Sequence, residues 1–355
     1  MGRNRFVSIL AVAAAVAAVV AAAGAAAGPG IYTTYQVISD GTAVQATATD
    51  KSLVNGWGLS AGPTTPWWTS NNGTNTSTLY SGVGAKQALT VAVPGGPTGT
   101  VFNADATAFV VSGGGKSGVA RFLFATEAGT ILGWSPTVAT TQTEVGADRS
   151  SAGAIYKGLA IADGKLFATD FHNGRVDVFD KTFTLVPNSG FSDPKLAKGY
   201  APFGIQALNG NIFVTYAKQD VAAKDDVPTP GGGFVDEYKT DGTLVARVAV
   251  AGKKNAPLNS PWGLALAPAD WGAFGGDLLV GNFGNGRISA YLDQGGGKWV
   301  YKGQLKRANG TPIEISGLWA IAFGNGAAAG PTNWLYYLSG PNDEANGLFG
   351  VITAG

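Results

Sequence analysis

Short apolar segments built around glycine recur along the chain, and each leads into a strand-like run, a Gly/Asn turn and a further strand. We recognise six such units, of which the clearest are GLAIADGKLFATDFHNGRVDVFD (158–180) and GLALAPADWGAFGGDLLVGNFGNGRISAYLD (263–293). Both predict an inner strand A (158–162, 263–267), a strand B (165–171, 277–283) and, after an Asn-Gly turn, a strand C. An internal repeat of this kind is typical of a β-propeller, in which each unit is one blade.

The other units follow the same order. Blade 1 starts near Val54, blade 3 at Lys157, blade 4 at Pro202, blade 5 at Pro261 and blade 6 at Gly317. Blade 2 is the most divergent, with strands predicted at 121–127 and 130–134 around a turn at Ala128-Gly129. Glycines at 58, 158, 204 and 263 in strand A predict that the inner strands pack closely around a central channel.

The strand-like segment IYTTYQVISD (31–40) has no unit of its own. Because a ring of blades must close without an unpaired sheet edge, we expect it to join blade 6 beside a C-terminal strand at 348–353. The predicted fold is therefore an all-β, six-bladed β-propeller, closed by pairing of the N-terminal strand with the last blade. Two insertions interrupt the repeat, at 135–156 and at 217–233, and long loops on a rigid scaffold are often functional.

The first 27 residues have the pattern of a signal peptide. Arg3 and Arg5 precede an Ala/Val-rich run over 6–27, and the alanines before Gly28 fit a cleavage site. An uncleaved anchor is the alternative, because a run of this length spans a bilayer. We expect cleavage, after which residues 28–355 form a single propeller domain, secreted or periplasmic, with no membrane segment.

Composition narrows the classes of function. Charged residues are 13% of the chain, glycine occurs 54 times and the net charge is +1. A near-neutral chain has no electrostatic footprint for nucleic acid. The sequence has no cysteine, which excludes disulfides, thiolate metal sites and cysteine nucleophiles.

Two apparent motifs are explained by the repeat. Gly58-Leu59-Ser60-Ala61-Gly62 matches a serine-nucleophile pattern, but that pattern needs a strand-to-helix turn, and Ser60 falls inside strand A of blade 1. GGGKSG (113–118) resembles a phosphate-binding loop, but position 110 is valine instead of the required glycine and no strand–helix unit surrounds it.

His172 is the sole histidine of the sequence, so a multi-histidine zinc site is excluded and any Ser-His-Asp triad must use this residue. The segment TDFHNGR (169–175) is predicted to place Asp170 and His172 at alternate positions of strand B, with both side chains on one face. They are the candidate catalytic residues. The alternative is that His172 is an ordinary residue of an Asn-Gly hairpin turn.

The B–C turns of a propeller open on one pole, together with the segments that lead into each strand A. Polar residues are predicted there in every blade, around an aromatic rim, whereas the opposite pole has short hairpins and is expected to be poorer. A concave pocket with a few converging polar groups is the usual form of a ligand site. The candidate ligand-binding residues are Asn72, Lys157, Phe203, Lys218, Trp262, Asn282 and Asn342.

Carboxylates from several blades at this pole suit a hard cation such as Ca²⁺. The candidate metal ligands are Glu127, Asp170, Asp343 and Glu344. The alternative is that each is a turn residue, because hairpin turns favour Asp and Asn for backbone reasons.

Several longer strings carry a resemblance to a known family. They are YKGLAIA (156–162), DFHNGRVDVFD (170–180), GYAPFGIQALNG (199–210), TYAKQD (215–220), LNSPWGLALAP (258–268), GDLLVGNFGNGRI (276–288) and GPNDEANGLFG (340–350). With them the chain resembles an uncharacterised family of secreted bacterial β-propeller proteins, some of which end in a sorting tail that does not follow VITAG in this chain. More distantly it resembles NHL-type and lactonase-like six-bladed propellers, which include metal-dependent hydrolases and lyases.

Two classes of function stay open. The first is a monomeric binding protein that takes a small molecule, a glycan or a protein ligand through the polar pole at the mouth of the channel. The alternative is a metal-dependent, calcium-type hydrolase or lyase that uses Asp170, His172, Asp343 and Glu344.

Overall fold

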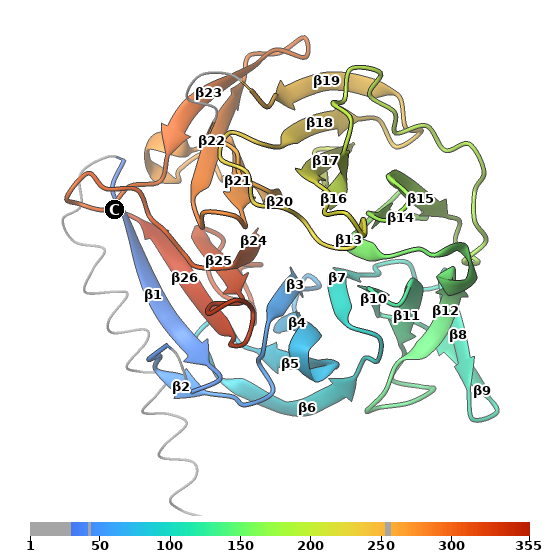
Figure 1. The fold of residues 1–355 in the computed structure, drawn as a ribbon. Coiled ribbons are helices and arrows are strands. Elements are labelled where there is room, and N and C mark those ends of the chain that lie inside the picture. Colours follow the sequence, from blue (N-terminus) through green and yellow to red (C-terminus); the bar gives the residue numbers. More distant parts are fainter. Residues whose placement is uncertain (1–29, 42–43, 253–256) are drawn as a thin grey trace, which may run out of the picture.

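The computed structural model describes residues 30–41, 44–252 and 257–355. In this part of the chain the structure consists of strands, three short 3-10 turns (Asn72–Thr74, Ser150–Ala152 and Gly272–Phe274) and no α-helix. Six sheets surround a central axis, so the predicted six-bladed propeller is confirmed (Figure 1). The predicted signal peptide lies outside the described residues. Within them, no helix has the length and apolarity needed to cross a membrane.

Each large sheet is one blade, whose innermost strand borders the channel. From the channel outward, blade 1 contains β3 (Gly56–Ser60), β4 (Trp67–Asn71), β5 (Thr76–Tyr80) and β6 (Lys86–Ala92). Blade 2 contains β7 (Pro97–Phe102), β10 (Phe122–Thr126), β11 (Thr130–Trp134) and β12 (Glu144–Asp148). Blade 3 contains β13 (Tyr156–Ala162), β14 (Lys165–Asp170) and β15 (Arg175–Phe179).

The other three blades are built in the same way. Blade 4 contains β16 (Tyr200–Leu208), β17 (Asn211–Lys218), β18 (Phe234–Tyr238) and β19 (Leu244–Ala249). Blade 5 contains β20 (Pro261–Leu266), β21 (Leu278–Asn282), β22 (Ile288–Asp293) and β23 (Trp299–Gln304). Blade 6 contains β24 (Leu318–Phe323), β25 (Trp334–Ser339), β26 (Leu348–Ala354), β1 (Tyr32–Ser39) and β2 (Ala48–Thr49).

Blade 2 is where the structure adds most to the sequence analysis. Its inner strand β7 was not recognised in the sequence, and the predicted insertion 135–156 contains its outer strand β12. The discarded GGGKSG motif lies in a small hairpin of β8 (Val110–Gly113) and β9 (Lys116–Val119), which is consistent with its dismissal as a phosphate loop.

The strand A glycines have a common packing role. A Cβ atom at Gly58, Gly99, Gly204 or Gly263 would collide with the backbone of the inner strand of the next blade. Glycine therefore lets neighbouring inner strands approach closely around the channel. Gly99 of β7 belongs to this set and identifies the missed strand.

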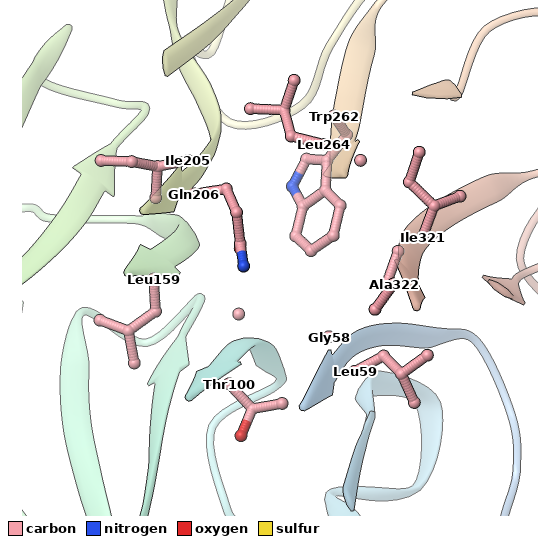
Figure 2. Close-up of a pocket in the computed structure, with 13 residues that line it drawn as sticks. Gly58, Leu59, Thr100, Leu159, Ile205, Gln206, Trp262, Leu264, Ile321 and Ala322 are labelled. Atoms are coloured by element: carbon pink, nitrogen blue, oxygen red, sulfur yellow. The ribbon is translucent and has the colours of Figure 1, made fainter. Parts of the chain in front are cut away.

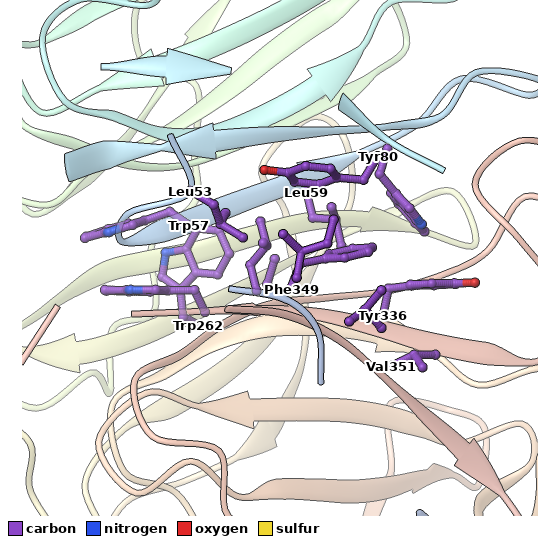
Figure 3. Close-up of a cluster of buried hydrophobic side chains, with 14 of the residues drawn as sticks. Leu53, Trp57, Leu59, Tyr80, Trp262, Tyr336, Phe349 and Val351 are labelled. Carbon is purple, nitrogen blue, oxygen red and sulfur yellow. The ribbon is translucent and has the colours of Figure 1, made fainter. Parts of the chain in front are cut away.

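Closure of the ring follows the prediction. β1 pairs antiparallel with β26, from Tyr32 opposite Ala354 to Ser39 opposite Leu348. Between blades 6 and 1, Phe349 lies between Tyr80 and Tyr336, with ring centroids 5.4 and 5.6 Å away (Figure 3). The first and last blades are thus joined by a sheet and by a shared apolar core.

Candidate functional site

The residue before the glycine position of strand A is buried in every blade. We call these six residues the inner ring: Trp57, Thr98, Lys157, Phe203, Trp262 and Trp319. Four are aromatic and pack together, with Trp57 stacked on Trp319 at 3.5 Å and Trp262 edge-on to both. Lys157 is the charged member of this set.

The aromatic residues of the inner ring are buried against one another. Phe203 and Trp262, two candidate ligand-binding residues, are buried, as are Trp57 and Trp319. Figure 3 labels Trp57 and Trp262. The predicted aromatic rim is thus a layer of buried rings. The physical reason is the narrowness of the channel, which presses the large rings against one another where the inner strands begin.

Polar side chains of several blades meet above this layer, at the pole where the B–C turns lie. Asn55, which leads into β3, donates from Nδ2 to Glu344 Oε2 of the β25–β26 turn over 2.9 Å. Asn72, in the β4–β5 turn, donates to Glu127 Oε2 of the β10–β11 turn, also over 2.9 Å. We call the group Asn55, Asn72, Glu127, Lys157, Asp225, Asp226 and Glu344 the polar pole.

Lys157 is the centre of the polar pole. Its side chain is only 1% exposed, and its Nζ lies 2.6 Å from Glu127 Oε1 and 3.1 Å from Asp225 Oδ1. The ammonium also lies 5.0 Å from the ring centroid of Trp57. Burial lowers the pKa of the Lys157 amine, but the charges of Glu127 and Asp225 outweigh burial and the pKa is raised. Lys157 is therefore a fixed positive charge.

Two other carboxyl groups have raised pKa values. Burial raises the pKa of Glu344 to about 7, and the hydrogen bond from Asn55 only partly offsets this. Burial likewise raises the pKa of Asp226 to about 6, and Asp225 adds to the effect. The pKa of Glu127 is lowered instead, because the charge and hydrogen bond of Lys157 outweigh the effect of burial on this carboxyl. The polar pole thus combines a permanent ion pair with two groups that titrate near neutral pH.

Buried polar atoms around the pole lack hydrogen-bond partners among the described residues. They are the indole N–H groups of Trp57 and Trp262, whereas the buried side chains of Asp226 and Ser260 interact with each other. An unpaired buried polar atom costs about 1–3 kcal/mol, so such a group is common where a ligand or water is bound.

Some of the non-glycine residues with positive φ lie at the same pole. Asn55 and Ser260, which lead into β3 and β20, have φ of 48°, and Asn342, Asp343 and Glu344 have φ of 58°, 50° and 65°. Each non-glycine residue in the left-handed region costs of order 1 kcal/mol, and this strain is typical of functional sites. At this pole the strained turn is what brings Glu344 to Asn55.

The structure unites some of the predicted site residues. Asn72, Lys157, Glu127 and Glu344 lie together at the polar pole. The other candidates lie apart. Asn282 is buried and bonds to the backbone of its own blade, Asn342 bonds to Asn346, and Lys218 is exposed at the end of β17.

Asp170 and His172 do not face one side of a strand. β14 ends at Asp170, and His172 lies in the following turn. Asp170 is buried and accepts hydrogen bonds from Asn173 and from the Ile155 N–H, whereas the His172 side chain is exposed. The predicted alternation is wrong because the strand stops before it reaches the histidine.

The four candidate metal ligands do not form a cage for Ca²⁺. In the described part of the chain no three Asp, Glu or His side chains converge in a way that suits a metal ion. Glu127 already bonds to the ammonium of Lys157, Asp170 is occupied in its own hairpin, and Asp343 is exposed. The lysine supplies the positive charge that a cation would bring, so the residues present do not fit a bound calcium ion.

Asp225 and Asp226 were not among the predicted site residues. They lie in the loop between β17 and β18, inside the insertion 217–233 that the sequence analysis singled out. The available signal was an acidic pair in a long B–C turn at the pole already favoured for function.

The opposite pole, which was expected to be poorer in polar groups, has a cavity. A cavity of about 310 Å³ opens there, at the ends of the inner strands. We call it the funnel; Ser60, Trp67, Thr100, Phe102, Gln206 and Phe323 are among the residues that line it. The short hairpins predicted for this pole leave the channel mouth uncovered, and no charged residue is among the described residues that line it.

Fold and site together define a six-bladed propeller with a charged, partly strained pole. The chain belongs to the same family as the uncharacterized protein L690 of Acanthamoeba polyphaga mimivirus, with 30% identity over 329 residues, 87% of this chain and 82% of that protein. No family model matches the sequence. Because this relative is viral, the resemblance to a secreted bacterial family stays a prediction.

Solved structures support the fold. The chain is similar to virginiamycin B lyase from Staphylococcus aureus, with a TM-score of 0.50 and 11% identity over 91% of this chain and 100% of that one. It is also similar to a glucose dehydrogenase, with a TM-score of 0.54 and 15% identity over 91% of this chain and 100% of that one. At such identities the likeness establishes the propeller fold alone.

The raised pKa of Glu344 leads to a pH-dependent prediction. Its folded pKa of about 7 lies above the ordinary value of 4.5, so the wild-type protein loses stability as pH rises from about 4.5 to 7. Glu344→Gln keeps an oxygen for Asn55 and removes the charge. We expect this variant to melt about 4 °C above wild type at pH 8 and at the same temperature at pH 4.5.

The matched control is Asp343→Asn, an exposed neighbour in the same turn, for which no change is expected at either pH. Melting curves followed by circular dichroism test both variants. A Glu344→Gln protein that is less stable than wild type at pH 8 would show that the ionised Glu344 carboxylate does not destabilise the fold.

Proposed function

We propose that this protein binds a small, positively charged organic molecule, such as an aliphatic amine, at the polar pole. The observation that supports this best is the excess of carboxyl groups. Glu127, Asp225, Asp226 and Glu344 gather around the one buried ammonium of Lys157. A site with surplus carboxyl groups attracts a ligand of opposite charge and resists an anion.

The unsatisfied atoms of the site fit such a ligand. Glu344 accepts one hydrogen bond, from Asn55, and Asp226 is a buried carboxyl beside the Ser260 side chain. The second carboxyl oxygen of Glu344 is thus available to an ammonium donor, and hydrogen bonds between charged groups are the stronger ones. The Trp57 and Trp319 rings beneath provide an apolar floor for a short hydrocarbon chain.

Binding of a cation is coupled to loss of protons. A positive ligand lowers the pKa of Glu344 and Asp226 from about 7 and about 6, so the bound state holds fewer protons than the free state. Affinity is therefore expected to increase as pH rises from 5 to 8.

A thermal-shift comparison tests this function. Putrescine is the probe, erythritol is the uncharged control, and NaCl keeps the ionic strength constant. We expect millimolar putrescine to raise the melting temperature more at pH 8 than at pH 5, and Asp226→Asn and Glu344→Gln to abolish the shift. Asp343→Asn is the control variant that should respond like wild type.

The same assay includes Ca²⁺, Mg²⁺ and EDTA. A shift with Ca²⁺ that EDTA reverses, and none with putrescine, would overturn the proposal in favour of an inorganic cation. Equal shifts with putrescine and erythritol would also contradict it, because charge would then play no part.

A second candidate function is acid–base catalysis at the same pole. It is favoured by Glu344, whose pKa of about 7 suits proton transfer at neutral pH beside the positive charge of Lys157. A screen of lactones and esters tests for hydrolase or lyase activity. Activity that rises with a midpoint near pH 7 and is lost in Glu344→Gln, but not in Asp343→Asn, would support this class.

A further inference from the structure

The funnel has the features of a second binding site, independent of the polar pole. It measures about 310 Å³, at the lower end of the range for small-molecule pockets, about 300–1,000 Å³. A smaller cavity of about 40 Å³ lies within the channel, where Leu59, Leu159, Ile205, Leu264 and Ile321 line it (Figure 2). This aliphatic layer lies between the funnel and the inner ring, so the two poles present separate chemistries.

The repeat explains why the funnel is open. The second residue after the glycine position of strand A is small in four blades, at Ser60, Ala160, Ala265 and Ala322. Blade 4 breaks this pattern with Gln206, whose exposed side chain points into the centre of the channel (Figure 2). Blade 2 has Val101 at this position, so Gln206 is the one long polar side chain of the set, and its amide places one donor and one acceptor in the cavity.

The lining contains uncharged hydrogen-bonding groups and aromatic walls. The Ser60 and Thr100 hydroxyls are 3.4 Å apart, and Gln206 makes no side-chain hydrogen bond within the described structure. Trp67 lines the same cavity, is 2% exposed, and has its indole N–H buried without an acceptor among the described residues. No Asp, Glu, Lys, Arg or His is among the described residues that line the funnel.

The rim is held in place by hydrogen bonds. Asn325 donates from Nδ2 to the carbonyls of Gly62 and Thr65, over 2.8 and 2.9 Å. Its Oδ1 accepts from the Ala327 and Ala329 N–H groups. A pocket with a braced rim needs little rearrangement on binding, and this lowers the entropic cost of association.

From these features we infer that the funnel binds a neutral, hydroxylated small molecule of about the size of a hexose. Hydroxyl groups satisfy Gln206, Ser60 and Thr100, while the apolar face of a sugar ring packs against Phe102 and Phe323. The absence of charged residues among the described lining residues disfavours an ionic ligand, because its charge would be desolvated without compensation.

Calorimetric titration and saturation-transfer NMR test this inference with glucose, galactose and N-acetylglucosamine as probes. Gluconate is the charged counterpart and cyclohexanol the apolar one. We expect at least one sugar to bind, with gluconate and cyclohexanol at least tenfold weaker. Gln206→Leu should weaken the sugar at least tenfold and Gln206→Trp should abolish binding, whereas the exposed control Gln294→Leu should bind like wild type.

Several results would overturn the inference: no binding of any of the three sugars, binding of cyclohexanol as tight as that of the sugar, or binding that survives Gln206→Trp. Circular dichroism melts establish that the Gln206 variants are folded, and folding is expected because this side chain is exposed. Saturating putrescine should leave sugar affinity unchanged, so this test stands even if the polar pole has another function.

Discussion

Removal of residues 28–45 is expected to lower the melting temperature of the protein by roughly 15 °C. The deletion removes β1, in which Tyr32, Val37 and Ile38 are each 1% exposed. Burial of three such side chains contributes about 6 kcal/mol, and for a large domain each kcal/mol corresponds to about 2–4 °C. Tyr32 also contacts Trp271 of blade 5 at 4.7 Å, so the loss extends beyond blade 6.

The deletion has a second consequence. β26 loses its outer neighbour and exposes a row of unpaired backbone groups, which favours aggregation. A synthetic peptide of residues 28–45 added in excess should recover much of the lost stability, because it restores the same strand. Differential scanning calorimetry with and without the peptide measures both effects. A truncated protein that melts within about 3 °C of wild type would show that closure of the ring does not depend on β1.

The sequence predicts blades well where glycine and turn residues repeat. The strand at Thr130–Trp134 was predicted to the residue, and the predicted strands of blades 3 and 5 differ from β13, β14, β20 and β21 by at most two residues at either end. β7 was missed because its segment begins with Pro94, Gly95, Gly96 and Pro97, which is typical of a loop. Its glycine, Gly99, has meaning only once the neighbouring blade is in place.

The candidate site was predicted in part, for a related reason. Alignment of the blades indicates which pole a residue belongs to, and it correctly grouped Asn72, Glu127, Lys157 and Glu344. It does not indicate how deeply a side chain is buried or which way it points. Trp262 and Phe203 are therefore buried core residues. Asp170 and His172 are separated because β14 ends between them. The approach of Asp225 to Lys157 depends on the path of a long loop, for which the repeat has no template.

Replacement of Lys157 by methionine is expected to lower the free energy of unfolding by about 3 kcal/mol at pH 8. Methionine fills a similar volume, so packing under Trp57 is largely kept, but Glu127 is left as a partly buried carboxylate without its cation. Removal of one partner of a buried ion pair costs about 3–5 kcal/mol, and the lower end applies because Glu127 is 22% exposed.

The reason for this loss can be isolated with a second substitution. If the cost arises from the orphaned charge, Glu127→Gln in the Lys157→Met background should recover most of the stability, since a neutral amide still accepts the hydrogen bond of Asn72. The loss should also shrink between pH 8 and pH 4. Without Lys157, burial raises the pKa of Glu127, and the carboxyl is neutral at low pH.

Urea unfolding of the two single variants and the double variant at both pH values measures this cycle. A double variant no more stable than Lys157→Met would assign the loss to packing and would contradict the ion pair as the organising contact of the polar pole. Recovery of stability in the double variant would identify the orphaned charge of Glu127 as the source of the loss, because the packing change at Lys157 is the same in both proteins.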